Sequence, residues 1–339
     1  MKKYNLVTIL VLFITLFSCT NNQNGYNEIF EEKQSVSLKQ LNNIFVDSLG
    51  RPEIIFSHKD NIFLADPTQT RLLFKYNINN DSILHLLSKG QGINEIYKIS
   101  NIGKGRNEEE IYVSDIITRS VYFVSSETED IIKDSLIFPN SFCDVAYDQD
   151  KTFFLLIGDK ERFAIRHNNT INYFGSNIKL DGIKDKSVNK ILQGTCVLSS
   201  VNKKIAWFSA YGDIFEIYSY NDVNNIDLVK SFKGISPIYY KDNGAMNINS
   251  IFGIQSVATD DKHIYALYNG KTLKEMMNNR EMAFFSNKIL VFNWAGEPIK
   301  ELMINQPIRS ITYDENNNQI LCLGLNEDYD NAIYSLSTI

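Results

Sequence analysis

The sequence predicts an all-β fold, a six-bladed β-propeller made of four-stranded antiparallel blades. From residue 36 onward, short runs rich in Ile, Val, Phe and Tyr alternate with polar positions, and turns of Asn, Asp, Gly and Lys separate them, which is typical of β-strands. One kind of strand also recurs at intervals of roughly 40 to 60 residues, the repeat length of propeller blades. Its six copies begin at Ile62, Ile111, Phe153, Ile205, Ile264 and Ile320.

The two ends of the chain are predicted to meet in the last blade. Residues 307–339 contain only three alternating strands, whereas residues 36–45 are apolar enough to supply the fourth. Pairing of these two segments would close the ring and cover the edges of the sheets. We therefore expect a single propeller domain over residues 36–339, with the N-terminal strand completing the last blade.

The first nineteen residues predict an export signal. Lys2 and Lys3 are followed by a mainly apolar run over residues 6–17, which is too short to span a bilayer stably and has the layout of a secretory signal. The run ends at Ser18-Cys19 and resembles a bacterial lipoprotein signal, which implies that residues 1–18 are removed and that Cys19 is lipidated. Residues 20–27 are polar, so residues 19–35 are expected to form a lipidated cysteine and a tether.

The charge and cysteine content exclude several classes of protein. The chain has 34 basic and 40 acidic residues and a net charge of −6. Loss of Lys2 and Lys3 with the signal peptide would make it −8, a balance that does not predict nucleic-acid binding. The three cysteines beyond Cys19 lie in apolar runs, and buried free thiols are the favoured interpretation over a disulfide. No C-x-x-C spacing indicates a zinc site. These cysteines are Cys143, Cys196 and Cys322.

Catalytic motifs are absent from the sequence. The four histidines fall in different repeats without a second His or Cys at ligand spacing, so neither a metal site nor a nucleophile–base pair is predicted. Gly103-Lys104-Gly105-Arg106 is interpreted as a polar hairpin turn, and residues 108–110, three glutamates, as a solvated turn or as a calcium contact. The expectation is no catalytic residue and no cofactor. The histidines are His58, His85, His167 and His263.

Two segments interrupt the strand pattern. Residues 271–285 lie between two strands of the fifth unit, and Leu273, Met276 and Met277 could form the apolar side of one short helix. This helix either offers an adaptable contact surface or, as we favour, packs back on the blade. Residues 233–250 are rich in Gly and Asn and predict a long loop between blades.

Two sequence segments resemble a known family. Residues 89–96, Lys-Gly-Gln-Gly-Ile-Asn-Glu-Ile, resemble the G-x-G-P-x-E loop of six-bladed propeller lipoproteins of Bacteroidetes, with Ile93 in place of proline. Residues 265–271 and 289–298 are similar to the late-blade pattern "Y-S-G-K … I-x-V-F-D-W-x-G-x-P" of the TolB-like group in those bacteria, with Asn269 and Asn293 as departures. The resemblance implies a six-bladed TolB-like propeller and no defined activity.

Together these observations favour a membrane-anchored lipoprotein that serves as a non-catalytic binding or scaffold module for an envelope protein or glycan. The alternative is a hydrolase or lyase acting on an extracellular polymer, which would need Asp, Glu, His or Arg side chains converging on one face. No acidic run follows Cys19, so we expect an outer-membrane location facing the periplasm. We also expect a monomer whose partners are the membrane, through its lipid anchor, and a protein or glycan.

Overall fold

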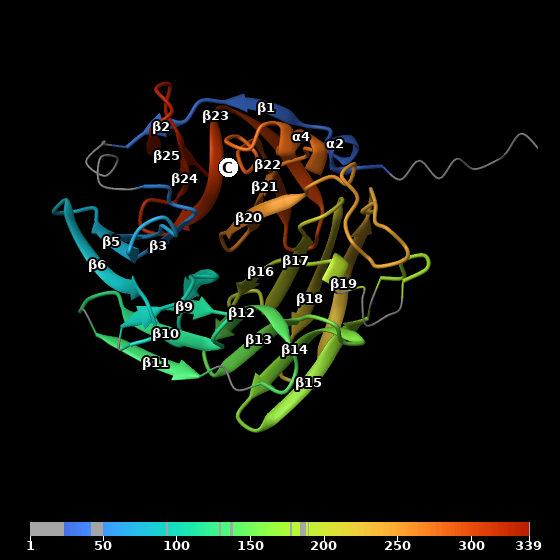
Figure 1. The fold of residues 1–339 in the computed structure, drawn as a ribbon, viewed down its shortest axis with the longest axis horizontal. Coiled ribbons are helices and arrows are strands. Elements are labelled where there is room, and N and C mark those ends of the chain that lie inside the picture. The colour runs from blue at the N-terminus through green and yellow to red at the C-terminus, as the bar shows by residue number, and fades with distance from the viewer. Residues whose placement is uncertain are drawn as a thin grey trace, which may run out of the picture.

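The computed structural model describes residues 24–338 except 42–49, 93, 129, 136–137, 177, 184–187 and 189. Cys19 and the predicted signal peptide lie outside the described residues. The described residues form antiparallel sheets, the blades, arranged around a central axis (Figure 1). The predicted propeller of antiparallel blades is therefore confirmed.

The first four blades are separate antiparallel sheets, each with its strands in chain order from the axis outward. β7 (Glu95–Ile96) adds a short parallel strand outside β6. The strands of blade 1 are β3 (Ile54–His58), β4 (Asn61–Ala65), β5 (Arg71–Asn77) and β6 (Ser82–Lys89). Those of blade 2 are β8 (Asn101–Lys104), β9 (Glu110–Asp115), β10 (Ser120–Ser125) and β11 (Ile131–Ser135). Those of blade 3 are β12 (Phe142–Asp148), β13 (Lys151–Leu156), β14 (Glu161–His167) and β15 (Thr170–Ser176). Those of blade 4 are β16 (Gly194–Ser199), β17 (Lys204–Ser209), β18 (Ile214–Tyr220) and β19 (Ile226–Lys233).

Blades 5 and 6 are joined by one long strand. The first half of β23 (Pro298–Asp314) is the outer strand of blade 5, and its second half is the innermost strand of blade 6. The remaining strands of blade 5 are β20 (Ile254–Thr259), β21 (His263–Tyr268) and β22 (Ser286–Asn293). The remaining strands of blade 6 are β24 (Gln319–Leu325), β25 (Asn331–Ser337) and β2 (Lys39–Gln40).

The N-terminal strand closes the ring as predicted. Lys39 pairs with Ser335 and Gln40 with Tyr334 in an antiparallel ladder, so β2 is bonded into the last blade. A second N-terminal strand, β1 (Lys33–Val36), runs parallel to β23 and lies outside blade 5. The amino-terminal segment thus covers the outer edges of two blades, edges that would otherwise expose unpaired backbone groups.

The predicted tether overlaps the folded part of the chain. α2 (Tyr26–Ile29) and most of β1 lie within residues 19–35, and the side chains of Tyr26 and Phe30 are buried. The Tyr26 amide donates a hydrogen bond to the Asp213 carboxylate at 2.9 Å. The predicted domain boundary at residue 36 is therefore too late. Local composition does not reveal this burial, because the pocket that holds the two aromatic side chains is formed by blades that lie far away in the sequence.

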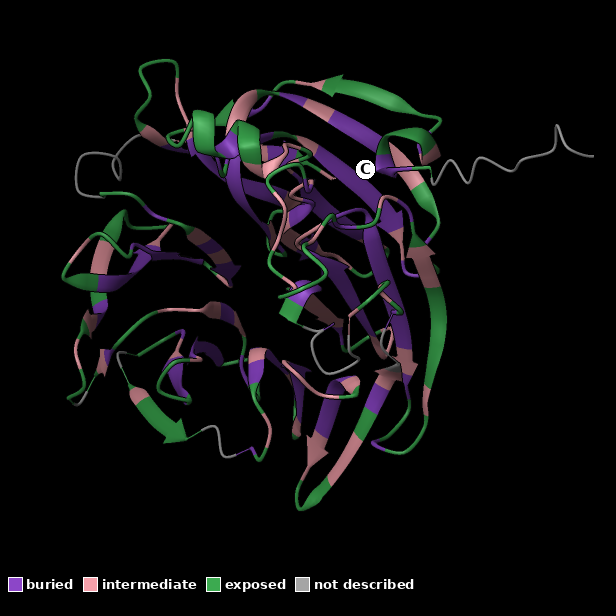
Figure 2. Cartoon of the chain, turned by 45° about the vertical axis from the view of Figure 1, so that its right-hand side comes forward, coloured by how far each residue is buried: buried purple, intermediate pink, exposed green. Residues whose placement is uncertain are grey.

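Each blade buries apolar side chains on both of its faces. Figure 2 shows strands that are buried along most of their length, with exposure concentrated in the loops and outer strands. Two buried carboxylates help to connect the blades. Asp66 accepts hydrogen bonds from the amides of Gly50 and Arg51, and Asp115 accepts one from the amide of Tyr97. Each carboxylate, at the end of a second strand, thus holds the chain that enters its blade.

The blade topology places all long loops on one face. Because the strands of a blade alternate in direction, the links between second and third strands and the links between blades lie where the innermost strands begin. We call this the loop face and the opposite side the turn face. The loop face carries residues 234–253, which contain nearly all of the inter-blade loop predicted over residues 233–250, and residues 269–285, which include α4 (Leu273–Asn278). Among the described residues, no helix is long and apolar enough to cross a membrane.

The helix predicted in the insertion is present. α4 begins with a capping box in which Thr272 and Glu275 bond reciprocally. Met276 is buried against the blade, as favoured from the sequence, whereas Met277 is 58% exposed. The insertion therefore both packs on blade 5 and presents an apolar side chain to solvent.

Candidate functional site: the central cavity

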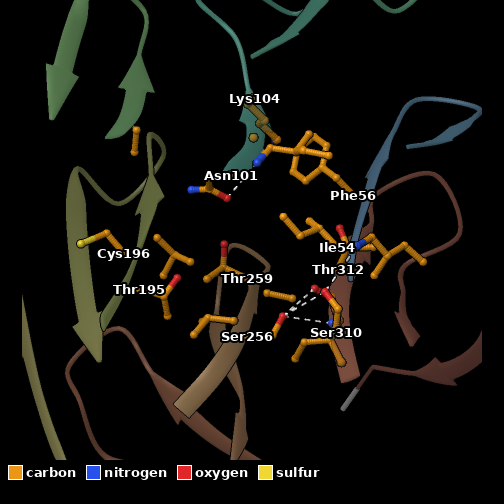
Figure 3. A pocket seen from close by; sticks show the side chains of 18 of the residues that line it. Ile54, Phe56, Asn101, Lys104, Thr195, Cys196, Ser256, Thr259, Ser310 and Thr312 are labelled. Atoms are coloured by element: carbon orange, nitrogen blue, oxygen red, sulfur yellow. Dashed lines mark hydrogen bonds between the residues drawn. The ribbon is translucent and has the colours of Figure 1, made fainter. Parts of the chain in front are cut away.

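A cavity of about 400 Å³ lies along the propeller axis. All six innermost strands contribute to its lining, with Ser, Thr, Asn and Gln side chains among Ile, Val and Phe (Figure 3). It is lined at the loop face by residues that begin these strands, such as Glu53 and Arg309, and at the turn face by residues that follow them, such as Glu315.

Hydroxyl groups connect the innermost strands of blades 5, 6 and 1. The Ile311 amide donates to Ser256 Oγ at 3.0 Å, and the Ser57 amide donates to Thr312 Oγ1 at 3.0 Å. The Ile55 amide donates to Ser310 Oγ at 3.3 Å. Neighbouring blades splay apart and do not share a backbone ladder here, so short polar side chains satisfy the inward-facing amides. These hydrogen bonds make this part of the wall rigid.

Asp144 connects blades 2, 3 and 4 in the same way. Its carboxylate accepts hydrogen bonds from Asn101 Nδ2 at 2.8 Å and from the Val145 amide at 2.9 Å, and lies 3.4 Å from the Cys196 amide. Removal from water disfavours the charged form, and burial raises the Asp144 pKa to about 6 despite these donors. The Tyr112 hydroxyl adds a further link by donating to the Val145 carbonyl at 2.7 Å.

An ion pair stands at each end of the cavity. At the loop face, Arg309 Nη2 contacts Glu53 Oε1 at 2.6 Å. At the turn face, Lys104 pairs with Glu315. Arg309 and Glu53 come from the neighbouring blades 6 and 1, whereas Lys104 and Glu315 come from blades 2 and 6, on either side of blade 1. Within each pair the two charges neutralise one another. The lining is therefore rich in hydrogen-bonding groups but carries little unbalanced charge beyond Asp144.

Titrating groups near Asp144 include the thiols of Cys143 and Cys196 and the Tyr112 hydroxyl, and burial raises the pKa of each. The groups that contact its carboxylate are an amide side chain and backbone amides, none of which titrates. The described residues contain no cluster of three or more His, Cys, Asp or Glu side chains that could hold a metal ion. What the cavity offers is a preformed set of donors and acceptors.

The three cysteines of the described chain are free thiols, as the sequence favoured. Cys143 and Cys196 are half-buried beside the cavity and Cys322 is buried. Burial raises the pKa of all three thiols well above its ordinary value, and the nearby Asp144 carboxylate adds to the effect at Cys143 and Cys196. A protonated, shielded thiol is a poor nucleophile.

The four histidines do not converge. His58 is buried, its ring Nε2 lies 3.0 Å from the Glu108 carbonyl, and desolvation lowers its pKa. His263 lies beside Asp260, and His167 beside Asp150. The fourth, His85, packs edge-on against a phenylalanine of blade 1. The expectation that each histidine falls in a different repeat is wrong for one pair, because His58 on β3 and His85 on β6 both belong to blade 1.

The two glycine-bearing motifs are backbone features. The Gly105 amide donates to the Glu110 carbonyl, which forms the predicted hairpin between β8 and β9, and Arg106 pairs with the Glu110 carboxylate. In the loop over residues 90–95, the Glu95 carboxylate accepts a hydrogen bond from the Gly92 amide at 2.7 Å. A side chain at Gly90 would overlap this carboxylate. Ile93 lies outside the described residues.

Sequence reasoning singled out Met277 but missed the other members of a group of exposed apolar side chains on the loop face. Each of these side chains belongs to a link between strands or between blades. The feature of the sequence that could have predicted them was a large apolar residue inside a segment otherwise rich in Asn, Asp, Gly and Lys. The group comprises Tyr97, Ile117, Ile238, Tyr240, Ile248, Met277, Phe284 and Tyr329.

The architecture defines the class of protein, a six-bladed β-propeller with a polar central cavity. The family comparison agrees: residues 28–316 match the family described as "TolB-like 6-blade propeller-like", and the chain belongs to that family. No curated protein sequence matches the chain significantly.

Two solved structures with a similar fold come from Bacteroides. A "putative exported protein" of Bacteroides fragilis NCTC 9343 superimposes with a TM-score of 0.58 at 11% identity, over 91% of this chain and 99% of that chain. A member of the DUF4221 family from Bacteroides vulgatus ATCC 8482 has a TM-score of 0.51 at 10% identity, over 88% of this chain and 94% of that chain. At these identities the likeness establishes the fold.

Proposed function

We propose that this protein is a lipoprotein of the cell envelope, anchored through Cys19, which acts as a non-catalytic binding module for an envelope protein or glycan. The basic start, the short apolar run and the cysteine that ends it support the anchor. Similarity in fold to an exported Bacteroides protein is consistent with export. We place the protein at the outer membrane, facing the periplasm, as a monomer.

The central cavity carries this proposal. Its inner strands are held together by Ser256, Ser310, Thr312 and Asp144, so its shape is set before any ligand arrives. A rigid wall of hydroxyl and amide groups with interspersed apolar side chains suits recognition of a hydrogen-bonding partner, because little conformational entropy is lost on binding. Hydrolase or lyase chemistry would require a titrating group that acts with Asp144 as acid or base, and burial keeps the nearby thiols of Cys143 and Cys196 protonated.

A cavity-filling substitution tests the proposal. Thr259 lines the cavity from the end of β20, and Thr259→Phe would occupy part of the space. Thr170→Phe introduces the same side chain at an exposed position on the outer strand of blade 3 and serves as the control. Each native lipoprotein is crosslinked in membranes, extracted with detergent and analysed for bound proteins and glycans.

We expect a partner to be recovered with the wild-type and Thr170→Phe proteins and lost with Thr259→Phe. Equal recovery with all three would show that the cavity is not the binding site. If the purified protein degrades envelope polysaccharide and Asp144→Asn abolishes this activity, the enzyme alternative is correct and the binding proposal is wrong.

A further inference from the structure

We propose that one sector of the loop face, on blades 4 and 5, rests on the lipid bilayer to which the protein is anchored. This sector, which we call the apolar patch, consists of Ile238, Tyr240, Ile248, Met277 and Phe284. The inference rests on the proposed lipidation of Cys19 and adds an orientation to it: blades 4 and 5 face the membrane and blades 1 and 2 lie away from it.

The two segments that carry the patch form one continuous surface. The Lys274 amide donates to the Ile248 carbonyl at 2.7 Å, which connects the start of α4 to the inter-blade loop. Within that loop the Asn247 amide donates to the Ile238 carbonyl at 2.9 Å. The ring of Phe284 lies edge-on against Phe252, at 5.8 Å between centroids. The patch is thus built on hydrogen-bonded backbone.

The patch exposes more apolar surface than a solvated loop requires. Its side chains are 49% (Ile238), 48% (Tyr240), 44% (Ile248), 58% (Met277) and 44% (Phe284) exposed. Single exposed apolar residues are ordinary, whereas a group of them on adjoining loops marks a surface that contacts another apolar phase. Met and aromatic side chains are suited to such contacts, since Met is flexible and Tyr joins an apolar ring to a polar hydroxyl.

The chain enters the folded domain beside this patch, which identifies the bilayer as the occupant. A methyl group on Gly25 would lie 2.8 Å from Ile235 Cδ1, and one on Gly234 would lie 2.6 Å from the Asn24 carbonyl oxygen. Ile235 begins the loop that leads to Ile238. Five residues separate Cys19 from this point, and they span at most about 18 Å when fully extended. A lipid on Cys19 therefore holds this edge of the ring near the headgroups.

The charges around the patch favour shallow insertion over adsorption to a charged polymer. The exposed charged side chains of the two segments are three basic and three acidic, so their charges balance. A balanced set of charges does not favour a partner held by strong electrostatic attraction. Insertion of apolar side chains into the headgroup region of the bilayer needs no net charge. The six are Lys241, Lys274, Arg280, Asp242, Glu275 and Glu281.

Tryptophan fluorescence in vesicles tests the orientation. The native residues Trp207 and Trp294 are both buried and provide a constant background. Phe284→Trp places a reporter in the patch. Tyr97→Trp places one at a position of similar exposure on the loop face between blades 1 and 2, away from the patch. The full-length lipoprotein is reconstituted in phosphatidylethanolamine–phosphatidylglycerol vesicles, with or without bromine on the acyl chains.

We expect brominated lipid to quench most of the added emission in Phe284→Trp, with a blue shift, and to leave Tyr97→Trp and the wild type unchanged. Equal quenching of the two variants, or none at Trp in position 284, would overturn the proposal. Unfolding midpoints equal to that of the wild type confirm that both variants fold.

Two further measurements make the outcome unambiguous. The mass of the N-terminal peptide shows separately whether Cys19 carries lipid, so a failed anchor is distinguished from a wrong orientation. An N-terminus that begins at Met1, with residues 6–17 retained, would overturn the proposed anchor and the orientation argued from it.

In the lipidated protein, vesicles should slow amide hydrogen exchange over residues 236–250 and 271–285, and the double substitution Met277→Ser and Phe284→Ser should abolish that protection. Protection that survives in this double variant would contradict the patch.

Discussion

Replacement of Tyr26 by alanine should destabilise the whole propeller, although Tyr26 lies in a segment that the sequence presents as a tether. The ring is fully buried between blades 4 and 5. It stacks on Phe232 at 5.4 Å between centroids and meets Tyr268 edge-on at 5.5 Å. Removal of a buried aromatic ring leaves a cavity that rigid strands cannot close, and such changes cost about 3–5 kcal/mol.

The same site provides a matched control. Among the described residues, the Tyr26 hydroxyl has no hydrogen-bond partner. Tyr26→Phe keeps the ring and removes a buried polar atom that makes no hydrogen bond, so it should leave the stability unchanged or raise it slightly. Tyr240→Ala, at an exposed position on the loop face, should also have little effect.

Urea unfolding followed by tryptophan fluorescence measures all three variants. The free energy of unfolding should fall by about 3–5 kcal/mol in Tyr26→Ala and by less than about 1 kcal/mol in the two controls. A loss below about 1 kcal/mol in Tyr26→Ala would refute the conclusion that the N-terminal segment is part of the core. A large loss in Tyr26→Phe would show instead that the hydroxyl makes a stabilising hydrogen bond.

Three other predictions follow from the cavity and the blades. Burial raises the Asp144 pKa from 3.8 to about 6, so the folded state binds a proton more tightly than the unfolded state. The contribution of protonated Asp144 to the free energy of unfolding is therefore fully present below about pH 4 and is lost as the pH rises to about 6. Relative to Asp144→Asn, the wild type should lose about 3 kcal/mol of unfolding free energy over this range. Parallel urea-unfolding profiles for the two proteins would contradict this. A methyl group at Gly194 would overlap the Phe208 carbonyl oxygen, so Gly194→Ala should lower stability by about 1–3 kcal/mol, and an unchanged unfolding midpoint would refute the overlap. The three propeller thiols should react slowly with a thiol reagent in the native state, since burial raises the pKa of each, and denaturation without reductant should release three reactive thiols per chain; a fourth would mean that Cys19 is free.

The sequence by itself determined the architecture, because strand alternation and blade repeats are local or periodic properties. The recurrent strands of the six units, the hairpin at Gly105 and the helix after Thr272 depend on neighbours within a few residues, and each is present. The closing strand could also be inferred, since the last unit had one strand too few. The lipidation of Cys19 rests on sequence alone and stays a prediction.

Only the tertiary structure decided which groups meet across blades. Tyr26 is buried because Phe215 and Phe292, far away in the chain, form its pocket. The proton affinity of Asp144 depends on Asn101 and Cys196, which come from the blades on either side. The apolar patch likewise joins two segments with no shared motif. Such properties arise from burial and long-range contacts, which the order of residues in one segment does not encode.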